Sequence, residues 1–155
     1  MIAQAARAGG LQEKPDLLKE RLFNAINDGD LVVARACLDA NAETPIQLSI
    51  DVLDEDGNTP LSEAACYGEL GLAQLLLLRG AHPDARNELG RTPIWRACYN
   101  GHYEVVKLLL ESGADKEIPS NTGEEPGKSP VFGLALRSSE ARKRRDEGPL
   151  SSLGC

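Results

Sequence analysis

Part of the chain repeats itself after 33 residues. When the sequence is aligned with itself at that offset, matching residues recur at turns, helix starts and helix cores: Gly57 and Gly90, Thr59 and Thr92, Pro60 and Pro93, Ala64 and Ala97, Gly68 and Gly101, Leu75, Leu76 and Leu77 with Leu108, Leu109 and Leu110, Gly80 and Gly113. A unit of this length cannot bury its apolar face alone, so neighbouring units must stack. The period therefore predicts a stacked array of helical repeats.

Each copy predicts two short helices. In the first, Thr59 is placed to cap a helix and Pro60 to occupy its first position, where the missing N–H costs nothing. We expect helices over 60–67 and 70–79, separated by Gly68, and over 93–100 and 103–111 in the second copy. We also expect the second helix to bury four leucines, Leu72, Leu75, Leu76 and Leu78.

A divergent unit precedes these copies. Apolar residues at helical spacing predict helices from Pro15 to about Gly29 and, capped by Asp30, from there to about Asn41. Within 43–55 the apolar residues alternate with polar ones, as in a strand: Ile46, Leu48, Ile50 and Val52. We interpret 43–55 as an elongated, acidic-ended loop whose apolar side lies against the first helical pair.

A third copy begins but departs from the pattern. Gly123 and Pro126 are on period, but Glu125 replaces the Thr and Pro130 falls at an Ala position. These residues disfavour a helix, so we expect 122–155 to be disordered. The expected organisation is an N-terminal segment 1–15, a divergent unit 16–55, repeats 56–88 and 89–121, and the tail. Nothing would then cover the helix over 103–111, which suggests a truncated or alternatively ended form of a longer protein.

Composition narrows the class of protein. The net charge is −7, with a balance of −10 in residues 1–126 and +3 in 127–155, which disfavours nucleic acid as the partner. The four cysteines form no CxxC pair, and no secretory signal or membrane-length apolar run is present. We expect a cytoplasmic protein without membrane insertion. A basic cluster at Arg142, Lys143, Arg144 and Arg145 suggests nuclear import as an alternative.

The repeat residues resemble the ankyrin-repeat family. The resemblance rests on Gly57-Asn58-Thr59-Pro60-Leu61 and Gly90-Arg91-Thr92-Pro93-Ile94, with the Leu-rich second helices and the closing Gly-Ala pairs. It covers about 16–119 and implies an all-α solenoid of stacked helix–turn–helix units joined by β-turn loops. The His that usually follows Thr-Pro-Leu is Ser62 in one copy and Trp95 in the other, whereas His102 keeps the family's mid-repeat His.

The resemblance also implies where a partner protein would bind: the turn tips and the exposed side of each first helix. The candidate residues at these positions are Glu55, Asp56, Asn58, Glu63, Tyr67, Glu88, Arg91, Trp95, Arg96, Tyr99 and Asn100. Trp95, Arg96 and Tyr99 are the sharpest group, because Trp, Tyr and Arg dominate binding hot spots. The alternative for Trp95 is structural packing between adjacent units.

No sequence motif indicates catalysis. GxSxG, HExxH and Gly-rich phosphate loops are missing from the sequence, and Gly101 interrupts the Cys98–His102 spacing. We therefore expect no catalytic, cofactor or metal site, and a monomer rather than an oligomer. The predicted function is a non-catalytic protein–protein interaction module. The alternative is a regulatory or targeting segment of a larger ankyrin-containing enzyme or cytoskeletal protein.

Overall fold

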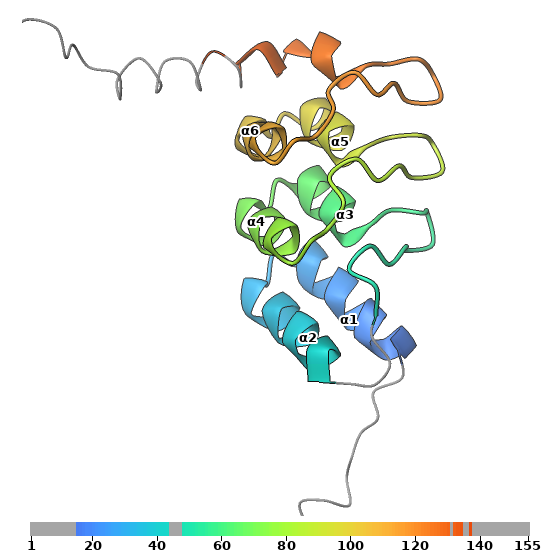
Figure 1. Ribbon diagram of the computed structural model, residues 1–155, viewed down its shortest axis with the longest axis vertical. Coiled ribbons are helices and arrows are strands. Elements are labelled where there is room, and N and C mark those ends of the chain that lie inside the picture. Colours follow the sequence, from blue (N-terminus) through green and yellow to red (C-terminus); the bar gives the residue numbers. More distant parts are fainter. Residues whose placement is uncertain (1–14, 44–47, 131, 135–136, 138–155) are drawn as a thin grey trace, which may run out of the picture.

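The computed structural model describes residues 15–43, 48–130, 132–134 and 137. The helices are α1 Pro15–Asn27, α2 Leu31–Glu43, α3 Pro60–Tyr67, α4 Leu70–Leu78, α5 Pro93–Tyr99 and α6 Tyr103–Glu111, followed by a 3-10 helix, η1, Pro126–Lys128. Figure 1 shows α1, α3 and α5 stacked in one column and α2, α4 and α6 in a second, with the connecting turns projecting beside the first column. These ranges contain no strand, so the predicted all-α stack of helical pairs is confirmed.

Local sequence signals set the helix ends. The Oγ1 atoms of Thr59 and Thr92 accept hydrogen bonds from main-chain N–H groups three residues later, at 3.2 and 3.3 Å. Asp30 Oδ1 caps α2 by accepting from the N–H groups of Val32 and Val33, both at 3.0 Å. Each cap satisfies N–H groups that the first helical turn leaves without a partner. The predicted caps are therefore present.

Gly68, between α3 and α4, is required for two reasons. Its φ of 76° lies in the left-handed region, and its N–H donates to Ala64 O at the end of α3. A Cβ added there would lie 2.5 Å from Nδ1 of His102, which packs against this position. Nε2 of His102 lies 2.9 Å from Cys66 O, so the family's retained His ties the second repeat to the first.

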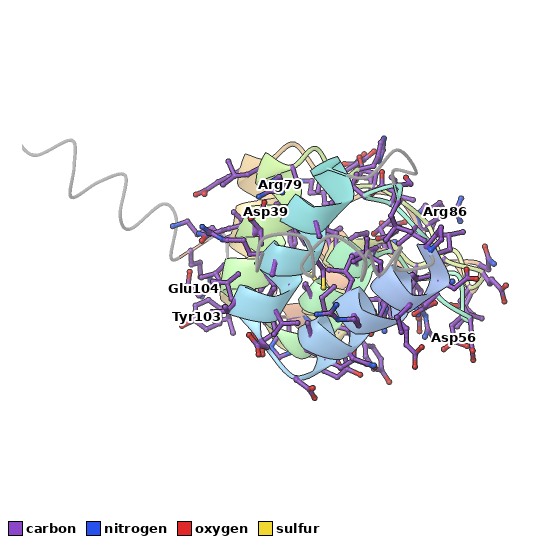
Figure 2. All side chains as sticks on the ribbon, turned by 90° about the horizontal axis from the view of Figure 1, so that it is seen from below. Asp39, Asp56, Arg79, Arg86, Tyr103 and Glu104 are labelled. Atoms are coloured by element: carbon purple, nitrogen blue, oxygen red, sulfur yellow. The ribbon has the colours of Figure 1, made fainter. Side chains whose placement is uncertain are left out.

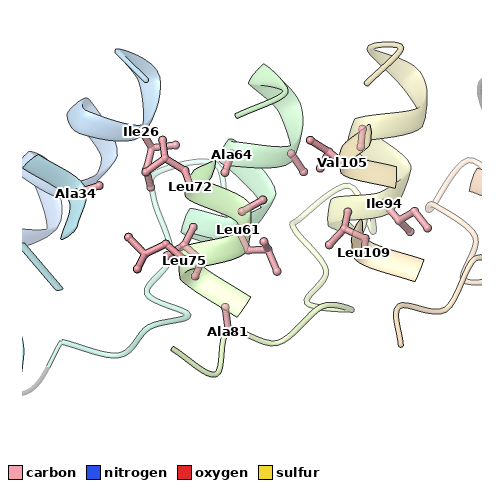
Figure 3. Close-up of a cluster of buried hydrophobic side chains, with 14 of the residues drawn as sticks. Ile26, Ala34, Leu61, Ala64, Leu72, Leu75, Ala81, Ile94, Val105 and Leu109 are labelled. Carbon is pink, nitrogen blue, oxygen red and sulfur yellow. The ribbon is translucent and has the colours of Figure 1, made fainter. Parts of the chain in front are cut away.

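The core runs through the stack and contains mainly Leu, Ile, Val and Ala. Figure 3 shows buried side chains from successive units meeting between the helices, among them Ile26, Leu61, Leu72, Ile94 and Leu109. The expectation that Leu78 is buried is wrong: its side chain is 85% exposed, whereas Leu76 is 1% exposed. Two residues correspond to about 200° around a helix, so Leu78 faces away from the side that Leu76 buries.

The long first loop has no strand in its described part. Leu48 and Ile50 are partly buried against the core, as expected for the apolar side of this loop. Residues 48–52 form turns and irregular structure, and Ile46 lies outside the described residues. The alternation of apolar residues therefore reflects packing of an irregular segment.

The third unit is more complete than expected. Ser120 N donates to Glu124 O at 2.9 Å, which repeats the Asp54 N to Asn58 O bond of the first turn. Pro126 in η1 is buried, and Phe132 joins the core cluster. The expectation of disorder from residue 122 therefore does not hold for 122–130 and 132–134. The turn is built from main-chain hydrogen bonds, which do not require the missing Thr.

Phe132 contradicts the expectation that nothing covers the last helical pair. Phe132 is buried and helical. Three residues before it, Ser129 Oγ donates a hydrogen bond to Cys98 O of α5 at 3.3 Å. An apolar ring thus lies in the core at this end of the stack, whereas truncation of a longer protein stays a prediction. Arg142, Lys143, Arg144 and Arg145 lie outside the described residues.

Substitution of Phe132 tests whether its ring stabilises the last helical pair, α5 and α6. Phe132→Ala should lower the stability of the last repeat by about 3 kcal/mol, because it deletes a buried aromatic side chain. Hydrogen exchange of the amides in α5 and α6 should then accelerate, while exchange in α1 changes little, since stability in such arrays is largely a nearest-neighbour property. Leu134→Ala, at an exposed position in the same segment, is the control. Unchanged protection of α5 and α6 in Phe132→Ala would contradict the assignment.

Candidate partner-binding surface

A hollow of about 650 Å³ lies along the first column of helices. Its lining comes from α1, from the first projecting turn, from α3 and from α5: Asp16, Lys19, Glu20, Phe23, Asn24, Asn27, Asp54, Glu55, Asp56, Asn58, Glu63, Tyr67 and Arg96. A second hollow of about 330 Å³ is lined by Trp95, Cys98 and Tyr99 with residues of the third unit. Both hollows take part of their lining from α5, Arg96 in the first and Trp95, Cys98 and Tyr99 in the second.

The structure brings most of the sequence candidates to these hollows. Glu55, Asp56, Asn58, Glu63, Tyr67 and Arg96 line the first, and Trp95 and Tyr99 line the second. Glu88, Arg91 and Asn100 line neither of the two. Eight of the eleven candidates therefore line the two hollows, but several of the eight are not exposed.

Asn58 is buried, and its side chain forms hydrogen bonds within its own turn and to the next one. Its Nδ2 donates to Asp54 Oδ2 at 3.2 Å, and its Oδ1 accepts from Asn87 Nδ2 of the next turn at 2.8 Å. If a buried amide lost one of these hydrogen bonds, the group left behind would stay out of water without a partner, which is unfavourable. Asn58 thus links adjacent projecting turns, contrary to the expectation of an exposed tip.

Glu63 and Arg96 form a largely buried ion pair across two repeats. Arg96 Nη1 lies 2.5 Å from Glu63 Oε1 and 3.3 Å from Ser62 Oγ, and the side chains of Arg96 and Glu63 are 16% and 9% exposed. Burial lowers the pKa of the Arg96 guanidinium, but the hydrogen bond and charge of Glu63 outweigh it and leave that pKa above its ordinary value. The pair joins α3 to α5, and little of either group remains free for a partner.

Trp95 is also engaged within the array. Its ring stacks on Tyr99 with a centroid distance of 5.1 Å and an interplanar angle of 11°. The Arg91 guanidinium carbon lies 4.2 Å from the centroid of the Trp95 ring. Trp95 is buried and both of these contacts come from its own repeat, so packing of its ring between adjacent units, the alternative raised by the sequence, stays a prediction. In the two hollows the accessible aromatic surface belongs to Tyr99, 73% exposed, and Tyr67, 49% exposed.

The Cys98 thiol in the second hollow is not an activated nucleophile. Cys98 lines it, and burial raises the pKa of this thiol to about 12, so the thiol stays protonated near neutral pH. Within the described part of the chain, no group of three or more His, Cys, Asp or Glu is placed to hold a metal ion.

Sequence reasoning missed two sets of residues that line the hollows. The first is the polar face of α1: Asp16, Lys19, Glu20, Asn24 and Asn27. The second belongs to the third unit: Gly123, Glu124, Glu125, Pro126, Lys128 and Ser129. The periodic Gly123 and Pro126 were the available signal for the second set, because they mark a turn and helix start like those before α3 and α5.

Comparison with known proteins agrees with this architecture. A family model described as ankyrin repeats (3 copies) matches residues 5–120, which includes the divergent first unit. A search of curated proteins gives no significant match. None of the helices in the described ranges combines the length and apolar character needed to cross a membrane. Ankyrin repeats are generally protein–protein interaction modules and typically non-catalytic. The stacked helical pairs, the Thr-Pro caps and the matched residues together show that this chain belongs to the ankyrin-repeat family.

Proposed function

We propose that this chain is a non-catalytic module that holds a partner protein on the surface formed by α1, α3, α5 and the projecting turns. The observation that carries the proposal is the pair of exposed tyrosines, Tyr67 and Tyr99, at two neighbouring hollows. Tyrosine contributes a large contact area at a small entropic cost, which suits it to binding hot spots. The buried Glu63–Arg96 pair and the Trp95 stack supply a rigid base beneath these side chains.

The tyrosines also give the test. Tyr67→Ala combined with Tyr99→Ala should weaken capture of a partner by roughly tenfold or more, because truncating a hot-spot residue costs about 2 kcal/mol. Partners would be recovered from cells by affinity purification with quantitative mass spectrometry. Tyr103→Ala is the matched control, since Tyr103 is 46% exposed but starts α6, in the other column of helices.

Circular dichroism should show that all variants stay folded, because the three tyrosines are at least 46% exposed. The proposal predicts partners that are lost in the double variant and retained in Tyr103→Ala. The same partners in the same amounts from wild type and the folded double variant would contradict it.

A further inference from the structure

The first hollow carries more carboxylates than its cations can neutralise. Asp16, Glu20, Glu55 and Asp56 line it and are exposed. Of the two cations in the lining, Arg96 is paired with Glu63, which leaves Lys19. The Asp54 carboxylate is used within the turn, where it accepts hydrogen bonds from the main-chain N–H groups of Asp56 and Asn58. The open part of this hollow is therefore net negative.

The second hollow adds an aromatic surface beside further carboxylates. Glu124 and Glu125 line it with the exposed Tyr99, and Glu125 pairs with the exposed Lys128 at 3.1 Å. The face of a tyrosine ring attracts a cation, and the aliphatic stem of Lys or Arg packs along such a ring. Tyr67 offers a second exposed ring in the first hollow. If Lys or Arg side chains of a partner entered these hollows, the carboxylates would contact their charged ends and the tyrosine rings would contact their aliphatic stems.

We propose that the partner is bound through a segment rich in Arg and Lys, an inference that rests on the proposed function. The acidic hollows, the two tyrosines and the absence of further cations from their lining all match this chemistry. Opposite charge speeds association and selects against acidic partners, while the rings contribute contact area.

The chain has its own basic cluster at Arg142–Arg145, but geometry favours a segment from another protein. From Arg137 the chain spans five residues to Arg142 and eight to Arg145, about 18 and 29 Å when fully extended. Figure 1 shows the last described residues at the end of the stack opposite α1, beyond α3 and α5. At 8–10 Å between successive helices the distance back to α1 is about 27 Å. Only the last residues of the cluster come within reach of α1, so the four basic side chains cannot all occupy the α1 part of the first hollow.

Binding of a fluorescein-labelled peptide of alternating Arg and Ser, followed by anisotropy, tests the proposal. The groove variant carries Glu20→Gln, Glu55→Gln and Asp56→Asn, all in the first hollow. It should weaken binding about tenfold or more, since three charges facing the peptide are removed. The control variant Glu104→Gln, Glu111→Gln and Glu117→Gln makes the same change in net charge at residues outside both hollows. Figure 2 shows Glu104 on the opposite side of the molecule from Asp56. The control should weaken binding by less than about threefold at 0.15 M salt, because distant charges are screened.

Three results would overturn the inference. The first is an equal loss in the groove and control variants, which would indicate attraction to net charge alone. The second is equal binding of a Glu–Ser peptide. The third is a tenfold gain in affinity when Arg142, Lys143, Arg144 and Arg145 are changed to Gln in the full chain, because the cluster would then occupy the groove. Tyr99→Ala should also weaken Arg–Ser peptide binding severalfold, which a purely electrostatic contact would not show.

Failure of this inference can be separated from failure of the proposed function. If the Arg–Ser peptide does not bind but a captured partner still depends on Tyr67 and Tyr99, the function stands and the partner chemistry is wrong. If no captured partner depends on the tyrosines, the proposed function itself fails.

Discussion

Replacing Leu76 with Ala should lower the free energy of unfolding by about 3 kcal/mol, whereas the same change at Leu78 should alter it by less than about 0.5 kcal/mol. Both residues are leucines in α4, two positions apart, but Leu76 is 1% exposed and Leu78 is 85% exposed. Leu76→Ala removes buried apolar contacts and leaves a cavity between stacked helices. Leu78→Ala removes atoms that already contact solvent. The comparison therefore isolates burial from helix propensity and from residue type.

Urea unfolding followed by circular dichroism at 222 nm gives the two free energies. Trp95 fluorescence is a second probe, located one repeat away on α5. Coincident transitions would justify a two-state treatment, which a repeat array does not guarantee. Similar losses in the two variants would contradict the packing of α4 described above.

The second large effect concerns the Glu63–Arg96 pair. Glu63→Gln should lower the stability by about 2 to 3 kcal/mol, because the substitution leaves the Arg96 guanidinium buried without its counter-charge. The matched control is Asp39→Asn. Asp39 pairs with Arg79 at the same distance, 2.5 Å, but the side chains of Asp39 and Arg79 are 56% and 36% exposed. Figure 2 labels Asp39 and Arg79 next to each other. An exposed pair contributes about 0 to 1 kcal/mol, so Asp39→Asn should have little effect.

A double-mutant cycle separates the pair from its surroundings. The combined variant Glu63→Leu and Arg96→Leu should be more stable than the sum of the two single losses predicts, by at least about 1 kcal/mol, since neither charge is then left unpaired. The loss in Glu63→Gln should also persist in 1 M salt, because solvent ions do not screen a buried pair effectively. Additive single losses, or equal effects of Glu63→Gln and Asp39→Asn, would contradict the structural role assigned to this pair.

The sequence predicts the helices well because their ends are coded locally. Thr59 and Thr92 cap helices whose first residue is Pro, and Gly68 ends α3, each through bonds within a few residues of the chain. The third unit was harder to predict, because Glu125 and Pro130 break the local pattern. Its turn combines the local bond from Ser120 N to Glu124 O with bonds to the preceding repeat, such as that from Asn121 N to Leu89 O at 2.9 Å. Such contacts between units are not visible in local residue preferences.

The candidate surface was predicted in outline but not in detail. Position within the repeat correctly placed Tyr67 and Tyr99 on exposed surface. It could not distinguish them from Trp95, which lies between Tyr99 and Arg91, or from Asn58, which bonds to the next turn. Burial of these side chains depends on the residues that lie beside them in the folded array, which belong to the same unit for Trp95 and to the next unit for Asn58. A pattern that treats each unit alike does not contain that information.

The sequence by itself determined the period, the helical pairs and the family, because these follow from caps, glycines and apolar spacing repeated at a constant offset. Only the tertiary structure decided which side chains remain free. Stacking turned Glu63 and Arg96 into a buried pair, exposed Leu78 and brought Phe132 into the core. The physical reason is that capping energies act over a few residues of one chain segment, whereas burial is a property of surfaces that meet only after the repeats have stacked.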